Sequence, residues 1–132
     1  MTRFSSCCGL WLLTLAFVGG CLERERGPEL FPVSGTVTLD GKPLVEGTVY
    51  FNTVQSGAID TLPVKDGQFA GKAIAGSRRV EVVAYRLIPV PGEMGGEVQE
   101  SLIAERYNTQ SKLTAVVSPT GPNEFKFEVE SE

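Results

Sequence analysis

Four glutamates gather in residues 89–108, the longest stretch of the chain without strand or helix periodicity. Carboxylate oxygens are the ligands that Ca²⁺ prefers, but these acids lack EF-hand spacing and no Asp-x-Asp motif accompanies them. The favoured interpretation is therefore solvated loop charge, with no metal and no cofactor. Long irregular segments of compact domains are usually functional or disordered. We therefore expect a ligand-binding or partner-binding loop, marked by Glu93, Glu97, Glu100 and Tyr107.

Three tyrosines, Tyr50, Tyr85 and Tyr107, could form a stacking face for sugars. The alternative is that Tyr50 and Tyr85 pack on a sheet face, and that Tyr107 fixes the long loop to the core. The only Trp of the chain is Trp11, close to the N-terminus. Packing is the favoured interpretation, and glycan binding stays as an alternative.

Catalytic groups are few, because the chain contains no His. This excludes imidazole zinc ligands, His general bases and a Ser-His-Asp triad. No pairing of a nucleophile with a base is visible in the sequence. An enzyme would need a pocket of perturbed carboxylates, for example Glu105 held near Asp66. We therefore expect a protein that is not an enzyme.

The N-terminus has the features of an export signal. Arg3 is followed by an apolar run from Cys8 to Val18, which is too short for a comfortable membrane span. Val18-Gly19-Gly20-Cys21 then resembles a bacterial lipobox, which predicts a signal peptide over residues 1–20 and lipidation of Cys21. The alternatives are an ordinary secretory signal or an uncleaved anchor. Because residue 22 is Leu rather than Asp, the resemblance implies the outer membrane of the cell envelope rather than the inner one.

The predicted mature chain is acidic. The sequence has 12 Lys and Arg and 16 Asp and Glu, and only Arg3 of these precedes Cys21, so residues 21–132 carry a net charge of −5. An acidic surface argues against nucleic acid as a partner. Residues 21–32 are charged and interrupted by Gly-Pro, which predicts a tether between the lipid and a single domain over residues 33–131.

The rest of the sequence predicts an all-β domain. Apolar residues alternate with polar ones, and turn signals such as Asp40-Gly41 and Asp66-Gly67 separate the alternating runs. This pattern favours a single antiparallel β-sandwich, either transthyretin-like or Ig-like, of about seven strands. The expected strands are 33–39, 47–51, 58–64, 69–74, 79–88, 112–118 and 124–130.

Three local expectations accompany this pattern. Pro63 cannot donate to a ladder, so the strand that carries it should lie at a sheet edge. Arg78 and Arg79 could contact a carboxylate partner, but a solvated strand start is the favoured interpretation. Residues 97–107 could form a helical turn or two.

One segment resembles a known family. Val33 to Phe51 reads V-S-G-T-V-T-L-D-G-K-P-L-V-E-G-T-V-Y-F, and Asp66-Gly67-Gln68-Phe69 and the strand after Gly76 continue the pattern. The chain is similar over residues 31–130 to carboxypeptidase-regulatory-like domains, and near its end to small bacterial lipoproteins built on them. The resemblance implies a transthyretin-like fold. Ser77-Arg78-Arg79 departs from it, where the family often has an aromatic residue.

The resemblance also bears on function. Metallocarboxypeptidases and transthyretin-like hydrolases rely on His, so only the non-catalytic module is matched. We therefore expect a lipid-anchored cell-envelope module that has a structural or protein-interaction role. It would have the membrane as a partner through Cys21 and an envelope protein as a second partner. The alternative is a surface lipoprotein that binds glycan or calcium through residues 89–108.

Overall fold

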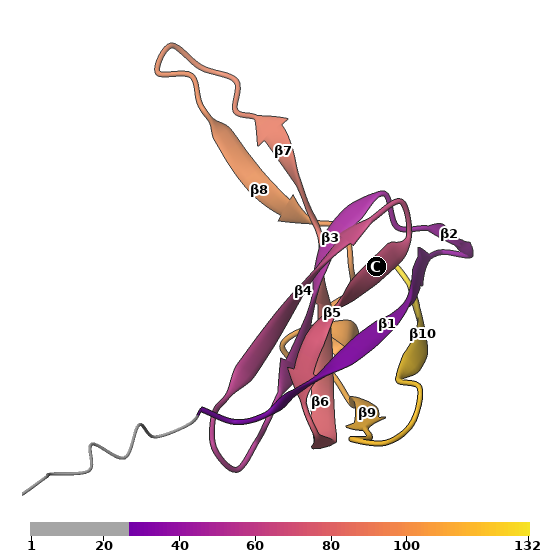
Figure 1. The fold of residues 1–132 in the computed structure, drawn as a ribbon. Coiled ribbons are helices and arrows are strands. Elements are labelled where there is room, and N and C mark those ends of the chain that lie inside the picture. The colour runs from indigo at the N-terminus through magenta and orange to yellow at the C-terminus, as the bar shows by residue number, and fades with distance from the viewer. Residues whose placement is uncertain (1–26) are drawn as a thin grey trace, which may run out of the picture.

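A computed structural model of the chain describes residues 27–132 (Figure 1). The expected signal peptide (1–20), the lipidation residue Cys21 and the first half of the expected tether (residues 21–26 of 21–32) lie outside these residues. The first strand begins at Leu30, three residues before the expected domain boundary. The described chain is all-β, with one short 3₁₀ helix, η1. The elements are β1 (Leu30–Leu39), β2 (Lys42–Pro43), β3 (Glu46–Asn52), β4 (Ile59–Lys65), β5 (Gln68–Ile74), β6 (Gly76–Val83), β7 (Tyr85–Pro89), β8 (Glu97–Ser101), η1 (Glu105–Tyr107), β9 (Leu113–Val117) and β10 (Glu124–Val129).

Most strands belong to one curled sheet. Its order is β10-β1-β5-β4-β3-β6-β9, with β2 paired to β1. All neighbours along this path are antiparallel except β1 and β10, which are parallel. Strands β7 and β8 form a separate two-stranded sheet. Among residues 27–132 no helix has the length and apolar character needed to cross a membrane.

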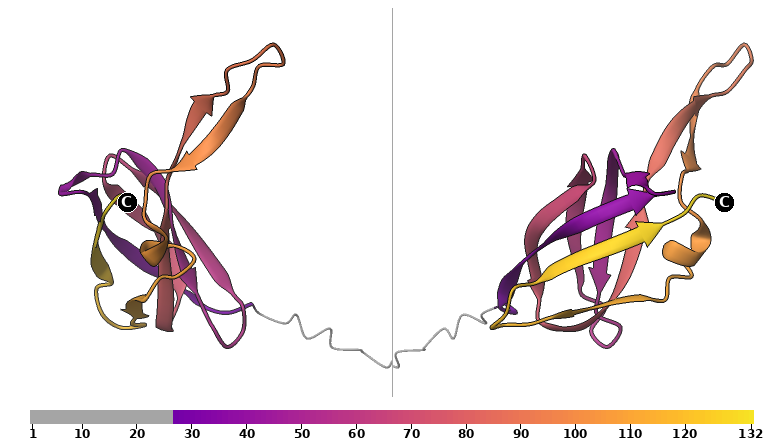
Figure 2. Two further views of the ribbon diagram at one scale, coloured as in Figure 1. Left: turned by 180° about the vertical axis from the view of Figure 1, so that it is seen from behind. Right: turned by 90° about the vertical axis from the view of Figure 1, so that its right-hand side faces the viewer.

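An aromatic cluster shows how strongly the sheet curls. Phe51 on β3 lies with its ring centre 5.6 Å from that of Phe125 and 6.3 Å from that of Phe127, both on β10. In the sheet order β10 is four places away from β3, so β10, at one end of the path, turns back toward β3. Figure 2 shows β1 and β10 lying across the strands β3 and β6. The apolar core fills the space between them.

Two tight turns connect strands as the sequence predicts. Asp40-Gly41 joins β1 to β2, and Asp66-Gly67 joins β4 to β5. Both Asp residues have positive φ, 51° and 52°, and the following glycines have 81° and 76°. Such turns need positive φ at both central residues, which Asp tolerates better than most residues and Gly adopts freely.

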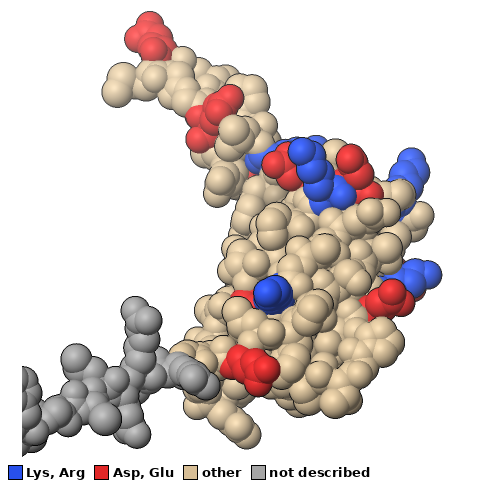
Figure 3. Space-filling view, viewed as in Figure 1, with Lys and Arg blue, Asp and Glu red and all other residues tan. Residues whose placement is uncertain are grey.

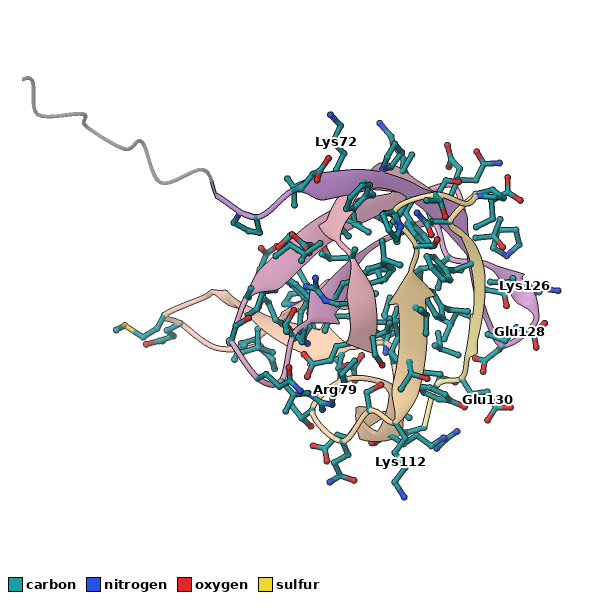
Figure 4. The ribbon with its side chains drawn as sticks, turned by 60° about the horizontal axis from the view of Figure 1, so that its bottom comes forward. Lys72, Arg79, Lys112, Lys126, Glu128 and Glu130 are labelled. Carbon is teal, nitrogen blue, oxygen red and sulfur yellow. The ribbon has the colours of Figure 1, made fainter. Side chains whose placement is uncertain are left out.

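The alternation of the last strand is confirmed. Phe127 and Val129 are buried in the core, and Phe125 is half-buried against it. Lys126, Glu128 and Glu130 point away from the body (Figure 4). Because one face of β10 is apolar and the other is charged, β10 can form the end strand of the sheet with one face on the core and the other in solvent.

The expected edge position of the Pro63 strand is wrong. Strand β4 pairs with β3 over its whole length, including Pro63 opposite Thr48. Its other neighbour, β5, pairs with it only at Val64 and Lys65, next to the turn. Beyond these two pairs the strands diverge, so Pro63 lies inside the sheet order without interrupting a long ladder on that side.

The expected strand 79–88 is two strands. It breaks at Ala84, where the ladder between β6 and β3 has just ended at Val83. The chain then leaves the main sheet as β7. The expected helical turns over residues 97–107 are also wrong for their first half, because residues 97–101 form β8. Only Glu105–Tyr107 is helical, as a single 3₁₀ turn.

Candidate functional site

A β-hairpin made of β7 and β8 projects from the body (Figures 1 and 2). The two strands pair only with each other, from Tyr85 opposite Ser101 to Pro89 opposite Glu97. Residues 90–96 connect them at the tip. The expected irregular loop 89–108 is therefore ordered as a hairpin strand, a short connection and the 3₁₀ turn.

The hairpin exposes an unusual share of the apolar surface. Ten large hydrophobic side chains are exposed among residues 27–132, and five of them lie on residues 85–98. Met94 at the tip is 99% exposed. The other four are Tyr85, Leu87, Val90 and Val98. Single exposed apolar residues are common, whereas a concentration on one projecting element is typical of an interaction surface.

The charged groups of the hairpin are mainly acidic. Arg86 and Glu100 face each other across the two strands and form an ion pair. Within the described residues Glu93 and Glu97 form no ion pair. Acidic side chains are the charged groups along the outer part of the hairpin on the face drawn in Figure 3. The hairpin thus combines apolar contact area with uncompensated negative charge.

Two hollows lie at the base of the hairpin. The larger, of ≈ 880 Å³, is partly lined by Ser101 at the end of β8 and by Leu102 and Glu105, which follow that strand. The smaller, of ≈ 480 Å³, is lined largely by apolar side chains, among them Leu44, Val45 and Tyr85. A partner that binds the hairpin would find further contact surface at its base.

The structure brings together only some of the site residues expected from sequence. Glu93, Glu97 and Glu100 share the hairpin, but within residues 27–132 no group of three acidic or Cys side chains is arranged to hold a metal ion. Tyr107 belongs to the body. It is half-buried against the core, and the guanidinium carbon of Arg106 lies 4.9 Å from the centre of its ring. The sequence predicts that Tyr107 fixes the long loop 89–108 to the core, whereas the structure has Tyr107 against the core only at the end of that segment, after the projecting hairpin.

The three tyrosines lie in different settings. Tyr50 is half-buried on β3, Tyr85 is 54% exposed at the base of the hairpin, and Tyr107 contacts the core. Tyr85 borders the two hollows at the base of the hairpin, and Tyr107 borders a different one. They do not form one stacking face.

The expectation of a solvated Arg78 is wrong. Its side chain is 1% exposed and forms a 2.8 Å ion pair with Asp60 on β4. It also donates hydrogen bonds to the backbone carbonyls of Phe51 and Ile74, at 2.6 and 3.0 Å. The sequence contained a signal for this position, because Arg78 has the same parity on β6 as the buried Val80 and Val82.

Arg79 is half-buried rather than solvated. It donates hydrogen bonds to the carbonyls of Ser111 and Thr109, both at 2.9 Å, and pairs with Glu81 at 2.5 Å. These bonds hold the segment between η1 and β9 against β6. Both arginines therefore stabilise the body of the protein, and neither contributes to the surface of the hairpin.

Comparison with known proteins adds no relative. No family model, curated protein or solved structure matches the chain. The family resemblance therefore depends on the sequence motifs alone, and the candidate site depends on the geometry of the hairpin.

One carboxylate near the hairpin base has an altered pKa. The hydroxyl and the backbone N–H of Ser131 donate hydrogen bonds to Asp40, at 2.7 and 3.0 Å, and they hold the pKa of Asp40 below its usual value. Because the folded-state pKa is lower than the unfolded one, the ionised form stabilises the fold. This stabilisation is fully present above the unfolded pKa of about 4 and is lost as the pH falls through the folded pKa.

We therefore expect Asp40→Asn to lower the thermal unfolding midpoint at pH 6, and the difference from wild type to shrink as the pH falls below about 4. Asn tolerates the positive φ of this position. Scans of the unfolding midpoint from pH 6 downward would measure this. Asp66→Asn is the matched control, since Asp66 holds the same place in the other turn and accepts no side-chain hydrogen bond within the described residues. A difference that stays constant with pH would contradict the account.

Proposed function

We propose that this protein is a lipid-anchored, non-catalytic module of the cell envelope that binds another protein through its β7–β8 hairpin. The observation that carries the proposal is the projection of an apolar, acidic hairpin from the curled β-sheet body. Exposed apolar side chains of this density favour contact with a partner over contact with water. The motif Val18-Gly19-Gly20-Cys21 supports the anchor.

The positions of the two ends of the body support this proposal. Strand β1 begins at the end of the body opposite to the hairpin (Figures 1 and 2). A chain anchored at Cys21 has nine residues to reach Leu30, which span up to roughly 30 Å when extended. The hairpin would then point away from the bilayer, toward partners in the envelope space or outside the cell.

The fold type is part of the proposal. We infer that the curled sheet is a transthyretin-like β-sandwich of the carboxypeptidase-regulatory-like kind. The strand-turn-strand motif from Val33 to Phe51 supports this, and so does the packing of Phe51 on β3 against β10. In this view β10, β1 and β5 form one layer, and β4, β3, β6 and β9 form the other.

A ligand-binding lipoprotein remains the alternative function. It has less support, because the three hairpin glutamates spread along the element and Glu100 is paired with Arg86. Tyr107, the fourth residue of the expected site, lies on the body and not on the hairpin. A protein partner needs only the exposed strands and side chains that the hairpin presents.

Two variants test the proposal. In the first, a two-residue Asn-Gly turn replaces residues 86–100 of the full-length chain. We expect its thermal midpoint to stay close to that of wild type, since both strands pair only with each other. Chemical crosslinking in cells should give discrete adducts for wild type, and these should disappear in the variant. Adducts that are unchanged in a folded variant would place the partner surface elsewhere.

The second variant, Cys21→Ser, tests the anchor. We expect it to leave the membrane fraction and to lose the mass of the acyl chains, because a single domain without an anchor has nothing to hold it at the bilayer. Fractionation and intact-protein mass spectrometry measure the two effects. Membrane retention with unchanged mass would contradict the lipoprotein assignment and would leave the hairpin proposal standing.

A further inference from the structure

The outer edges of β7 and β8 differ in the backbone hydrogen-bonding groups that they expose. The N–H of Val90 donates to the carbonyl of Gly96, and the N–H of Leu102 donates to that of Ala84, both at 2.9 Å. Even-numbered residues of β7 therefore turn their backbone groups toward β8. By the same alternation, the backbone groups of the odd-numbered residues face outward on both strands. On β8 these are Glu97, Gln99 and Ser101.

The edge of β7 is less suited than the edge of β8 to pairing with an added strand. Its outward positions are Tyr85, Leu87 and Pro89, and Pro89 has no N–H to donate. The edge of β8 has no proline, so it presents three N–H donors and three carbonyl acceptors in register. Unpaired rows of this kind are templates for an added strand.

The negative charge near the edge of β8 determines which kind of strand can pair with it. Glu97 lies on this edge and Glu93 precedes it at the tip, and neither forms an ion pair within residues 27–132. At the foot of the strand the ≈ 880 Å³ hollow is also lined by Glu105 and Glu132. A second copy of the chain would bring the same acids against these, so like-charge repulsion disfavours it. A segment with Lys or Arg would instead neutralise them.

Building on the proposed function, we propose that the edge of β8 accepts an extended, cationic segment of another protein as the third strand of the hairpin sheet. Backbone hydrogen bonds to Glu97, Gln99 and Ser101 fix its register. Its Lys or Arg side chains lie beside Glu97 and Glu93. Its apolar side chains cover Val98 and its cross-strand neighbour Ile88. These two residues lie on the face of the two-stranded sheet opposite to the face that carries Glu97. A two-stranded ribbon is only marginally stable alone, and a third strand also stabilises it.

The test uses the full-length protein in uncharged detergent micelles and two synthetic peptides. One alternates Val with Lys, and the other alternates Val with Glu. We expect the Lys peptide to bind, to protect the amides of Glu97, Gln99 and Ser101 from hydrogen exchange, and to bind more weakly as salt is added. The Glu peptide should leave these amides unprotected.

Two proline variants make the test specific. Gln99→Pro removes an outward donor of β8, and we expect it to weaken binding of the Lys peptide at least about tenfold. Leu87→Pro removes an outward donor of β7, leaves the ladder between the strands intact, and should bind the peptide as wild type does. Thermal midpoints of both variants check that the body is folded.

The proposal would be overturned by equal binding of both peptides, by absence of protection at β8, or by binding that survives Gln99→Pro. Protection of the same amides in the protein alone at high concentration would assign the edge to a second copy. These peptide-binding results can be distinguished from the in-cell crosslinking results for the hairpin-deletion variant. Loss of those adducts with a negative peptide result keeps the hairpin as the partner site and rejects the cationic strand.

Discussion

Replacing Arg78 with methionine is expected to lower the free energy of unfolding by about 3–5 kcal/mol. Methionine keeps most of the volume but leaves the carboxylate of Asp60, whose side chain is 13% exposed, without its guanidinium partner. The carbonyls of Phe51 and Ile74 also lose a donor. Removing one member of a buried charge pair costs more than the pair contributes, because the remaining charge stays partly desolvated.

Urea denaturation of Arg78→Met and of a control variant measures this effect. Lys126→Met is the control, because its ion pair with Glu128 is exposed and should be worth less than about 1 kcal/mol. Adding Asp60→Leu to Arg78→Met should recover part of the loss, since an apolar replacement of both partners leaves no unpaired charge. A change below about 1 kcal/mol for Arg78→Met would show that water reaches Asp60 and compensates it.

Phe51→Ala is expected to cost about 3–5 kcal/mol. The Phe51 side chain is fully buried, and its ring packs edge-on against Phe69, Phe125 and Phe127. Its ring contacts join β3 to β10 across the curled sheet. Its removal leaves a cavity between strands that have no ladder in common, so the surrounding chain can close it only by moving a whole strand.

Two substitutions calibrate this expectation by thermal or urea unfolding. Phe51→Leu keeps part of the contact and should cost clearly less than Phe51→Ala. Val116→Ala on β9 should change stability little, since Val116 is 67% exposed. If Phe51→Ala behaved like Val116→Ala, β10 would not pack against β3, and the proposed two-layer arrangement would be wrong.

Strand positions were predictable from sequence where one face of the strand is buried. Val37 on β1 and Phe127 and Val129 on β10 alternate with polar residues, and the structure buries all three. The Asp-Gly turns were predictable because positive φ at both central residues restricts the choice of residue. Local pattern and turn chemistry were therefore enough for the all-β class.

The hairpin strand β8 was not predictable from the same signals. Its sequence Glu-Val-Gln-Glu-Ser contains one apolar residue, and no residue of the strand is buried. A strand with two exposed faces has no period to detect, because burial on one face creates the alternation. The acids were identified as a candidate site, but their arrangement along a projecting strand needed the structure.

Neighbour relations were the other information missing from sequence. Pro63 is tolerated inside the sheet order because β4 and β5 pair at only two positions, next to their turn. Arg78 is buried because Asp60, which lies 18 positions earlier on β4, meets it across the body. A charged residue at an inward position is ambiguous until its partner is known.

Position-specific photo-crosslinking in cells that express the full-length protein would show whether the β7–β8 hairpin binds a partner. A photoreactive residue is placed at Met94 on the hairpin tip or, as a matched exposed control, at Val116 on β9. We expect a discrete adduct with another protein from position 94 and none from position 116. An adduct from position 116 alone, or from neither position while the protein remains folded at the membrane, would contradict the hairpin as the partner-binding element.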